Sequence, residues 1–222
     1  MNDLNYGNIL KSEIEEEYSK RKLLYRGIKR GSDILFSILG LVCLSPILLI
    51  IAILIKVDSK GPIIFSQTRV GYKGNNFKMY KFRSMVKDAE VLKSNLESKN
   101  EMSGPMFKMK KDPRITKIGG FLRKTSIDEI PQLLNVIKGD MSLVGPRPSL
   151  PNEVCQFDDW MLKRLDVKPG LTCFWQVSGR NDIEFEEWMK LDIKYVEERS
   201  LLVDVKLILR TFLVLFGDEH AR

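Results

Sequence analysis

The longest hydrophobic pattern in the chain is the run from Ile34 to Ile55, in which 22 residues carry no charge. As a straight helix at ~1.5 Å per residue this run spans roughly 33 Å, about the thickness of a bilayer core. A polar and highly charged segment precedes the run, and no small-residue cleavage site follows it, so it is not a signal peptide. The pattern predicts insertion into a membrane.

The middle of this run is interrupted by Ser45 and Pro46. The proline removes a backbone donor and crowds the carbonyl of Val42, while the serine hydroxyl can bond the carbonyl of Val42 or Leu41. Because cationic residues flank both ends of the run, the positive-inside rule is met if both ends lie in the cytoplasm. Two interpretations remain open: a kinked helix that spans the bilayer, and a re-entrant helix that returns to the same face.

Beyond the run, residues 61–85 alternate between polar and apolar positions. They predict two strands joined by a Gly/Asn turn. In the second strand, Lys81 and Arg83 would lie on one face, about 7 Å apart. The alternative without a functional role is a solvated hairpin edge.

Three later segments show helical patterns. Residues from Ser126 to Lys138 predict a helix closed by Gly139, and Glu184 to Arg199 predicts another. Leu201 to Phe216 is apolar with interspersed charges. It predicts a helix that either lies at the membrane interface or packs on the domain.

Together these elements predict a mixed α/β, mostly helical fold in one membrane-associated domain. Its parts are a polar helical arm at 1–30, a re-entrant membrane helix kinked at Ser45 and Pro46 at 31–57, and a cytoplasmic catalytic domain at 58–222 with an interfacial C-terminal helix. A doubly wound sheet is not expected, because no regular βαβ alternation is visible.

Composition narrows the chemistry. Thirty-six Lys and Arg residues against 29 Asp and Glu give a net charge of +7, which suits a phosphorylated substrate or an anionic membrane surface. The three cysteines form no CxxC pair, and the one histidine, His220, lies two residues from the end, so a zinc site and a histidine base are not expected. Interleaved acidic residues make a nucleic-acid partner a poor fit.

Two adjacent acids, Asp128 and Glu129, stand out in this basic chain. Ser126 and Glu129 match a capping box, which accounts for the acids structurally. A chemical role is the alternative, because a carboxylate attacks phosphorus without needing a base, and carboxylates hold divalent cations on diphosphates. Arg123 precedes the pair, and Arg147 follows in a rigid Pro-Arg-Pro frame.

Several long motifs carry a resemblance to a known family. "FSQTRVG", "FKMYKFRSM", "ITKIGGFLRKTSIDEIPQLLNVIKGDMSLVGPRP" and "KPGLTCFWQVSGRN" resemble, in order, the monotopic phosphoglycosyl transferases among the bacterial sugar transferases. They are most similar to the polyprenyl-phosphate hexose-1-phosphate transferases of exopolysaccharide and capsule synthesis. The resemblance covers about Lys29 to Phe216. It implies a re-entrant helix bent at Ser45 and Pro46.

The resemblance also implies an activity and a site. Such enzymes transfer a sugar phosphate from a UDP-sugar to undecaprenyl phosphate and release UMP, at the cytoplasmic face of the bacterial plasma (inner) membrane. Asp128 would form a covalent phosphosugar intermediate, and Glu129, together with Asp128, would bind Mg²⁺. Phosphate or nucleotide contacts would come from the family's basic positions: Lys81, Arg83, Arg123, Arg147 and Arg180.

Other expectations are less specific. Asp192 and Asp204 match acidic family positions, and we expect them to form structural salt bridges. A homodimer is compatible with the sequence. The main alternative function is a basic, membrane-anchored adaptor without catalysis; a second is direct transfer with Asp128 as a base.

Overall fold

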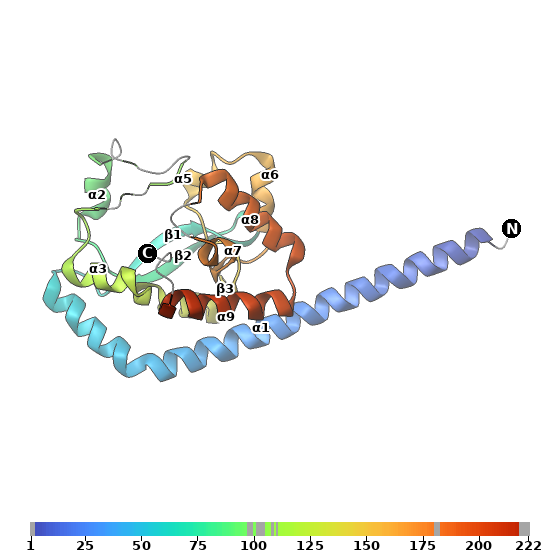
Figure 1. The fold of residues 1–222 in the computed structure, drawn as a ribbon, viewed down its shortest axis with the longest axis horizontal. Helices are drawn as coiled ribbons and strands as arrows, with labels where there is room; N and C mark the ends of the chain where they lie inside the picture. Colours follow the sequence, from blue (N-terminus) through green and yellow to red (C-terminus); the bar gives the residue numbers. More distant parts are fainter. Residues whose placement is uncertain are drawn as a thin grey trace.

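One helix, α1 (Asp3–Asp58), carries both the polar N-terminal segment and the apolar run in the computed structural model of the chain. The structure describes residues 3–96, 100, 105–107, 109, 111–179 and 183–217. Figure 1 shows α1 extending away from the remaining elements at its N-terminal end and passing beneath them. The helical arm and the helical apolar run are therefore confirmed as helix.

The helix α1 continues through Pro46, and its ribbon bends beneath the domain in its light-blue part (Figure 1). Ser45 Oγ donates a hydrogen bond to the carbonyl of Val42 at 2.8 Å, as the sequence predicted. Both ends of the apolar run contact the same domain. Gly40 faces Leu133 of a later helix, and Ile55 is buried with side chains that follow in the chain.

The predicted hairpin is confirmed. Strand β1 (Ile64–Val70) pairs antiparallel with β2 (Asn76–Phe82), and the 3-10 turn η1 (Tyr72–Gly74) joins them. Lys73 and Gly74 in the turn both have positive φ, at 54° and 79°. The glycine accommodates this conformation without cost, which is why a Gly/Asn-rich stretch forms the turn.

A second, parallel pair was not predicted: β3 (Ser142–Val144) with β4 (Gly170–Thr172). Two glycines allow the chains to cross closely just beyond β3. A Cβ on Gly145 would fall 2.3 Å from the Lys168 carbonyl oxygen, and one on Gly170 would fall 2.1 Å from the Gly145 nitrogen. Backbone atoms meet there, so side chains are excluded.

The remaining elements are mostly helical, which confirms the predicted mixed and mainly helical class. α8 and α9 match the two C-terminal helices that the sequence predicted. In chain order the helices are α2 (Ala89–Ser94), α3 (Lys117–Lys124), η3 (Ile127–Glu129), α4 (Gln132–Lys138), α5 (Pro151–Val154), α6 (Asp159–Leu162), η4 (Lys163–Asp166), α7 (Phe174–Val177), α8 (Phe185–Glu198) and α9 (Leu201–Gly217).

The prediction of one helix from Ser126 to Lys138 with a capping box is wrong. Ser126 has a left-handed backbone (φ 57°, ψ 14°) and makes no side-chain cap hydrogen bond, and η3 is separate from α4. An N-cap residue needs an extended backbone, which Ser126 does not have. Gly139 does close α4 as predicted, with φ 93°.

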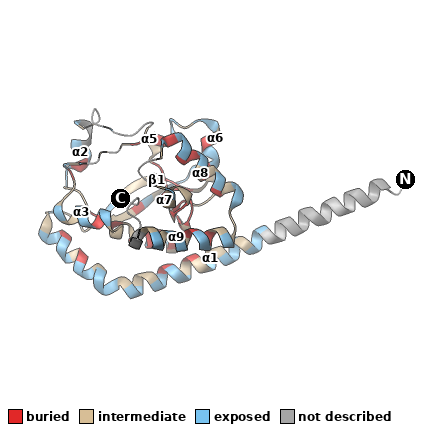
Figure 2. Cartoon of the chain, in the orientation of Figure 1, coloured by how far each residue is buried: buried red, intermediate tan, exposed pale blue. Residues whose placement is uncertain are grey.

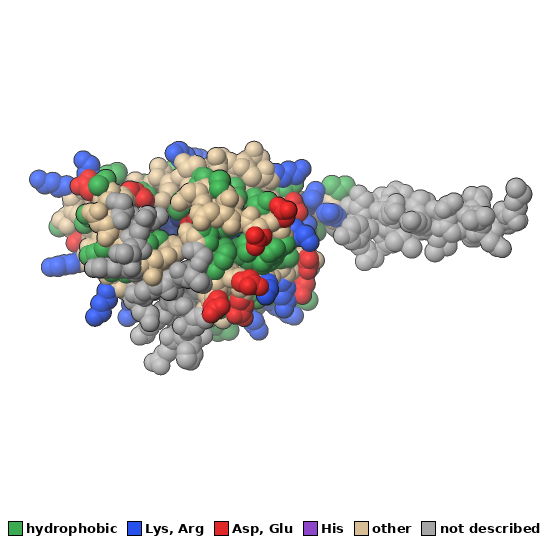
Figure 3. All heavy atoms as spheres, turned by 90° about the horizontal axis from the view of Figure 1, so that it is seen from above, with side chains coloured by type: hydrophobic (Ala, Val, Ile, Leu, Met, Phe, Trp, Pro, Cys, Tyr) green, Lys and Arg blue, Asp and Glu red, His purple; other side chains and the backbone are tan. Residues whose placement is uncertain are grey.

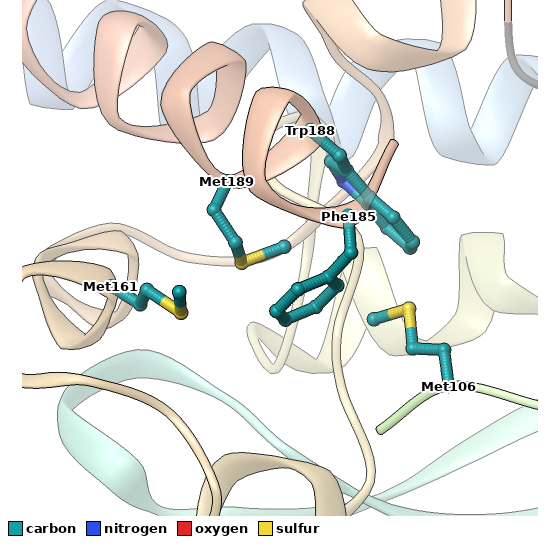
Figure 4. Close-up of a cluster of buried hydrophobic side chains, with 5 residues drawn as sticks. All are labelled: Met106, Met161, Phe185, Trp188 and Met189. Atoms are coloured by element: carbon teal, nitrogen blue, oxygen red, sulfur yellow. The ribbon is translucent and has the colours of Figure 1, made fainter. Parts of the chain in front are cut away.

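Buried hydrophobic side chains hold these short elements together in several clusters. One joins α6 and α8 to the segment that contains Met106; Figure 4 shows Met106 beside Phe185 and Trp188. Another packs β3 against α8 and α9 through Val144 and Tyr195. Because each element is short, packing rather than helix propensity fixes its position.

One side of the molecule is apolar and uncovered. Most of the described part of α1 is exposed (Figure 2), and its stretch Lys22–Asp58 is long and apolar enough to cross a membrane, by length and composition. We call the exposed hydrophobic side chains of α1 and α9 the apolar base. Its members include Leu35, Phe36, Leu39, Val42, Ile47, Leu49, Ile50, Ile53, Leu54, Leu202, Val205, Leu209, Phe212 and Leu213.

The face away from the apolar base is different. Seen from above, it carries charged side chains of both signs around hydrophobic areas (Figure 3). An uncovered apolar side opposite a charged one is typical of a protein that rests on or in a membrane.

Candidate active site

Two adjoining cavities of about 500 and 340 Å³ meet around Asp128. Four cationic side chains line both of them, together with the acid Glu153; the cations are Arg69, Lys81, Arg123 and Arg147. Such a concentration of positive charge around two acids suits a ligand with several negative charges. The structure therefore brings the predicted acids and three of the predicted cations into one place.

Asp128 lies on the 3-10 turn η3 and is 6% exposed. The left-handed residue Ser126 separates this turn from α3, so the carboxylate enters the cavity instead of continuing along a helix. Among the described residues, none donates a hydrogen bond to the Asp128 carboxylate. Its oxygen atoms therefore remain available to a ligand.

The neighbouring acid Glu129 is held firmly. Lys81 Nζ lies 2.6 Å from Glu129 Oε1, and Arg147 Nη1 lies 3.0 Å from the same oxygen. Within the described part of the chain no hydrogen bond reaches the other oxygen, Oε2. The two acids thus have distinct surroundings: Glu129 is paired through one oxygen, whereas no ion pair or hydrogen bond to the Asp128 carboxylate is formed among the described residues.

The pKa values of the two acids move apart. Burial raises the pKa of Asp128, and the Glu129 charge adds to the rise, while Lys81 works against it. Burial also disfavours the charged form of Glu129, but Lys81 and Arg147 outweigh it and hold the pKa of Glu129 well below its usual range. Two coupled acids pushed in opposite directions are typical of a functional site.

Arg147 reaches Glu129 from the loop that follows β3, and neighbouring residues fix this loop. Arg69 Nη1 donates to the Pro148 carbonyl at 3.1 Å, and the backbone nitrogen of Val70 donates to the Ser149 carbonyl at 2.9 Å. Burial lowers the pKa of Arg69 to about 10, and the charge of Arg147 adds to this. Strand β1 of the hairpin therefore fixes the position of the loop that contains Arg147.

Two predicted basic residues stand apart from this arrangement. Arg83 lines the larger cavity, but its Nη2 donates to the carbonyls of Ile55 and Ser59, at 3.1 and 2.5 Å, at the end of α1. Arg83 therefore lines the same cavity as Lys81, while its guanidinium binds the C-terminal end of α1. Arg180 lies outside the described residues.

Three residues of the site were missed by sequence reasoning. Arg69 and Glu153 line both cavities, with Arg69 Nη1 4.0 Å from Glu153 Oε2. The motif "FSQTRVG" contains Arg69 and could have indicated it, whereas nothing local marks Glu153, which caps the backbone nitrogen of Leu150 at 2.7 Å. Arg164 is the third; it lies behind the Arg147 loop.

The expected structural salt bridges of the two other acids are confirmed. Asp192 pairs with Arg164 at 2.6 Å, and Asp204 pairs with Lys29 of α1 at 2.9 Å. Tyr195 also donates to Asp204 at 2.7 Å, so this second pair ties α8 and α9 to α1.

The oxygen ligands available for a metal ion are few. Among the described residues, no group of three or more His, Cys, Asp or Glu side chains is placed to hold a metal. Asp128 and Glu129 offer two carboxylates, which is the number that Mg²⁺ commonly takes when phosphate oxygens and water complete its shell. The arrangement fits an ion that binds together with a diphosphate.

Comparisons with known proteins agree with this chemistry. Residues 24–218 match the bacterial sugar transferase family, and the chain belongs to that family. A galactosyl transferase, CpsE, from Streptococcus agalactiae is 50% identical over 195 residues, which cover 87% of this chain and 43% of the relative. The undecaprenyl-phosphate galactose phosphotransferase of Salmonella typhimurium is 42% identical over 212 residues, covering 94% and 44%.

The chain thus spans less than half the length of both relatives. A shorter one, the exopolysaccharide production protein ExoY of Sinorhizobium fredii, is 41% identical over 188 residues, which cover 82% of this chain and 83% of the relative. The family is therefore shown over nearly the whole chain.

Proposed function

We propose that this chain transfers a sugar phosphate from a UDP-sugar to undecaprenyl phosphate, producing a polyprenyl diphosphate sugar and UMP, as an early membrane step of exopolysaccharide or capsule synthesis. The names of its relatives support the substrates. The observation that carries the proposal is Asp128: a buried carboxylate to which no described residue donates a hydrogen bond, in a cavity lined by four cationic side chains. An adaptor would have no use for such an arrangement.

The reaction proceeds in two displacements at one phosphorus atom. An Asp128 oxygen attacks the phosphorus that bears the sugar; the bond from this phosphorus to the bridging oxygen breaks, and UMP leaves with that oxygen. An oxygen of undecaprenyl phosphate then attacks the same phosphorus, and the bond to Asp128 breaks. The carboxylate is regenerated, and no general base is needed, because an ionised carboxylate and an ionised phosphate attack phosphorus directly.

The cations around Asp128 stabilise the charge that moves during these steps. Arg147 and Lys81 lie within 3.0 Å of Glu129 and can turn toward the substrate phosphates, and Arg69 and Arg123 line the same space. Fixed positive groups aimed at phosphate oxygens are the main source of catalysis in phosphoryl transfer.

Glu129, through the oxygen Oε2 that no described residue contacts by a hydrogen bond, and Asp128 are the residues that would hold Mg²⁺ between the protein and the diphosphate. When bound, the ion neutralises charge on the phosphate oxygens. The protein's own part is to keep Glu129 ionised, which the two cations on Oε1 ensure.

The membrane arrangement we propose is re-entrant, with the domain on the cytoplasmic face. If α1 spanned the bilayer, the two ends of its apolar run would lie on opposite faces. Instead Asp33, at the first end, accepts a hydrogen bond from the Leu143 nitrogen, while Ile55, at the other end, packs with Leu122 and Phe82. Both ends thus contact one polar domain, and the apolar base would sit in the lipid beneath it.

The test is UMP release by the purified protein with Mg²⁺, undecaprenyl phosphate and a panel of UDP-hexoses that begins with UDP-galactose. Asp128→Asn serves as the matched variant, because it keeps the shape and removes the nucleophilic charge. UMP from at least one sugar, abolished in the variant, supports the proposal. With active lipid, no UMP from any UDP-sugar would leave the adaptor function as the better explanation.

A further inference from the structure

A buried ion pair lies behind the Arg147 loop and lines neither cavity at Asp128. Arg164 of η4 and Asp192 of α8 are 3% and 0% exposed, and Arg164 Nη2 lies 2.6 Å from Asp192 Oδ2. The proposed reaction gives neither residue a part, because neither reaches the space where a substrate would bind.

The guanidinium of Arg164 also binds the Arg147 loop at two points. Its Nη2 donates to the carbonyl of Arg147 itself at 2.7 Å, and its Nη1 donates to Ser149 Oγ. Arg147 is therefore held at its backbone by Arg164 while its side chain reaches Glu129 at 3.0 Å. A continuous chain of contacts runs from Asp192 through Arg164 and Arg147 to Glu129.

Other contacts of the loop hold its two ends. The Gly145 nitrogen donates to the Thr172 carbonyl and the Gly170 nitrogen to the Pro146 carbonyl, both at 2.9 Å, and Arg69 donates to the Pro148 carbonyl. Among the described residues, Arg164 is the one that binds the carbonyl of Arg147. Between the contacts at Pro146 and Pro148, the orientation of the Arg147 carbonyl therefore depends on Arg164.

We propose that Arg164 and Asp192 are positioning residues that hold Arg147 within reach of Glu129 and of the substrate diphosphate. The effect on catalysis rests on the proposed function, whereas the positioning of Arg147 by Arg164 rests on the contacts alone. Asp192 neutralises and orients the guanidinium of Arg164, and this guanidinium fixes the position of the Arg147 backbone beside the cavity.

The chemistry of the pair suits this role better than a stabilising role. Burying two charges costs desolvation energy, and a hydrophobic replacement is often as stable, so a buried pair is weak support for stability as such. A planar guanidinium can meet a carboxylate, a carbonyl and a hydroxyl at fixed angles, which a lysine ammonium cannot. Arg164 meets all three.

The first measurement needs no substrate. Arg147 is modified with phenylglyoxal, and the rate is read by peptide mass spectrometry in wild type, Asp192→Asn and Asp204→Asn. Asp204 is the matched control, because it is also a buried aspartate in an ion pair, but with Lys29 of α1. We expect Asp192→Asn to change the rate at Arg147 by severalfold and Asp204→Asn to leave it unchanged.

The second measurement asks whether Asp192 acts through Arg147. The value of kcat/KM for UMP release is compared in wild type, Asp192→Asn, Arg147→Ala and the double variant. Residues in one network show coupling that corresponds to roughly 2- to 150-fold in rate. We expect Asp192→Asn to lower kcat/KM by such a factor in wild type and to add nothing once Arg147 is removed.

Several outcomes would overturn the inference. One is an unchanged modification rate at Arg147 in Asp192→Asn; another is an equal loss of kcat/KM from that variant with or without Arg147. If wild type releases no UMP, the proposed function fails, but the modification rates still decide whether Arg147 is positioned. Should Asp192→Asn not fold, Ser149→Ala removes one contact of Arg164, keeps the ion pair, and is judged by the same rates.

Discussion

Two lysine–glutamate pairs in this chain have the same length and differ in burial, which allows a matched prediction. Lys81 Nζ to Glu129 Oε1 and Lys190 Nζ to Glu186 Oε1 are both 2.6 Å. The side chains of the first pair are 15% and 23% exposed, whereas both side chains of the second are 64% exposed. We predict that Lys81→Met destabilises the protein strongly and that Lys190→Met does not.

The expected magnitude follows from what remains after each substitution. Breaking a buried pair leaves an uncompensated charge and costs about 3–5 kcal/mol. Arg147 still pairs with Glu129 at 3.0 Å, so the lower end, about 3 kcal/mol, is expected for Lys81→Met. For a chain of this size that corresponds to a fall of about 6–12 °C in Tm. The exposed Lys190 pair is screened by water, so no measurable shift is expected.

The assay is thermal unfolding of both variants in the same detergent at low and high salt, with UMP release measured in parallel. Lys81→Met should also lose activity, because Lys81 lines both cavities at Asp128. Lys190→Met should remain as active as wild type. Equal shifts in Tm for the two variants would refute the argument from burial, and full activity of Lys81→Met would refute its place in the site.

Three further predictions concern other parts of the molecule. Burial raises the pKa of Asp192 to about 6. The folded state therefore binds the proton of the Asp192 carboxyl more tightly than the unfolded chain does. The stability that this proton contributes is fully present below about pH 4 and is lost as the pH rises through 6. Wild type should therefore lose about 2 kcal/mol relative to Asp192→Asn between pH 4 and pH 7, measured as the difference in their thermal unfolding. Gly145→Ala should abolish UMP release and lower Tm, because its Cβ would fall 2.3 Å from a backbone oxygen, whereas Gly120→Ala, whose Cβ would have no neighbour nearer than 3.9 Å, should be tolerated. In a protein whose exposed Cys43 and Cys155 are replaced by serine, a bimane label on Leu209→Cys in the apolar base should be quenched by nitroxide lipids, and the same label on Lys190→Cys should not; equal quenching would contradict the placement of α9 at the membrane.

Much of the fold could be predicted from local patterns in the sequence. The uncharged run, the Gly/Asn turn between β1 and β2, and the apolar period of α8 and α9 each follow from neighbouring residues alone. The bond from Ser45 to Val42 was predicted for the same reason, since both partners lie within one helical turn.

Other features depend on contacts between distant residues and could not be read locally. The parallel pair of β3 and β4 joins segments that are 28 residues apart, Ser142 and Gly170, and each strand has only three residues. The capping-box pattern at Ser126 failed because tertiary packing places that residue in a left-handed turn. A sequence motif specifies residue types, but it does not specify the backbone conformation that tertiary packing imposes on them.

The candidate site divides in the same way. The two acids and Arg147 stood out because charge and proline make them conspicuous in sequence. Arg69, Glu153 and Arg164 join the site only through the folding of the hairpin and η4 around the loop. Arg83, two residues from Lys81, lines the same cavity, but its guanidinium also binds the end of α1, a contact between distant residues that local sequence does not reveal.

The central claim is that Asp128 forms a covalent bond to the phosphosugar, and trapping that intermediate tests it most directly. The protein is incubated with a UDP-sugar that supports UMP release and with Mg²⁺, but without undecaprenyl phosphate, and is then examined by intact-mass and peptide mass spectrometry. The account predicts a phosphosugar on the peptide that contains Asp128, formed together with one equivalent of UMP and absent in Asp128→Asn. UMP that forms only when the lipid acceptor is present, with no adduct at any time, would contradict it and indicate a single direct displacement.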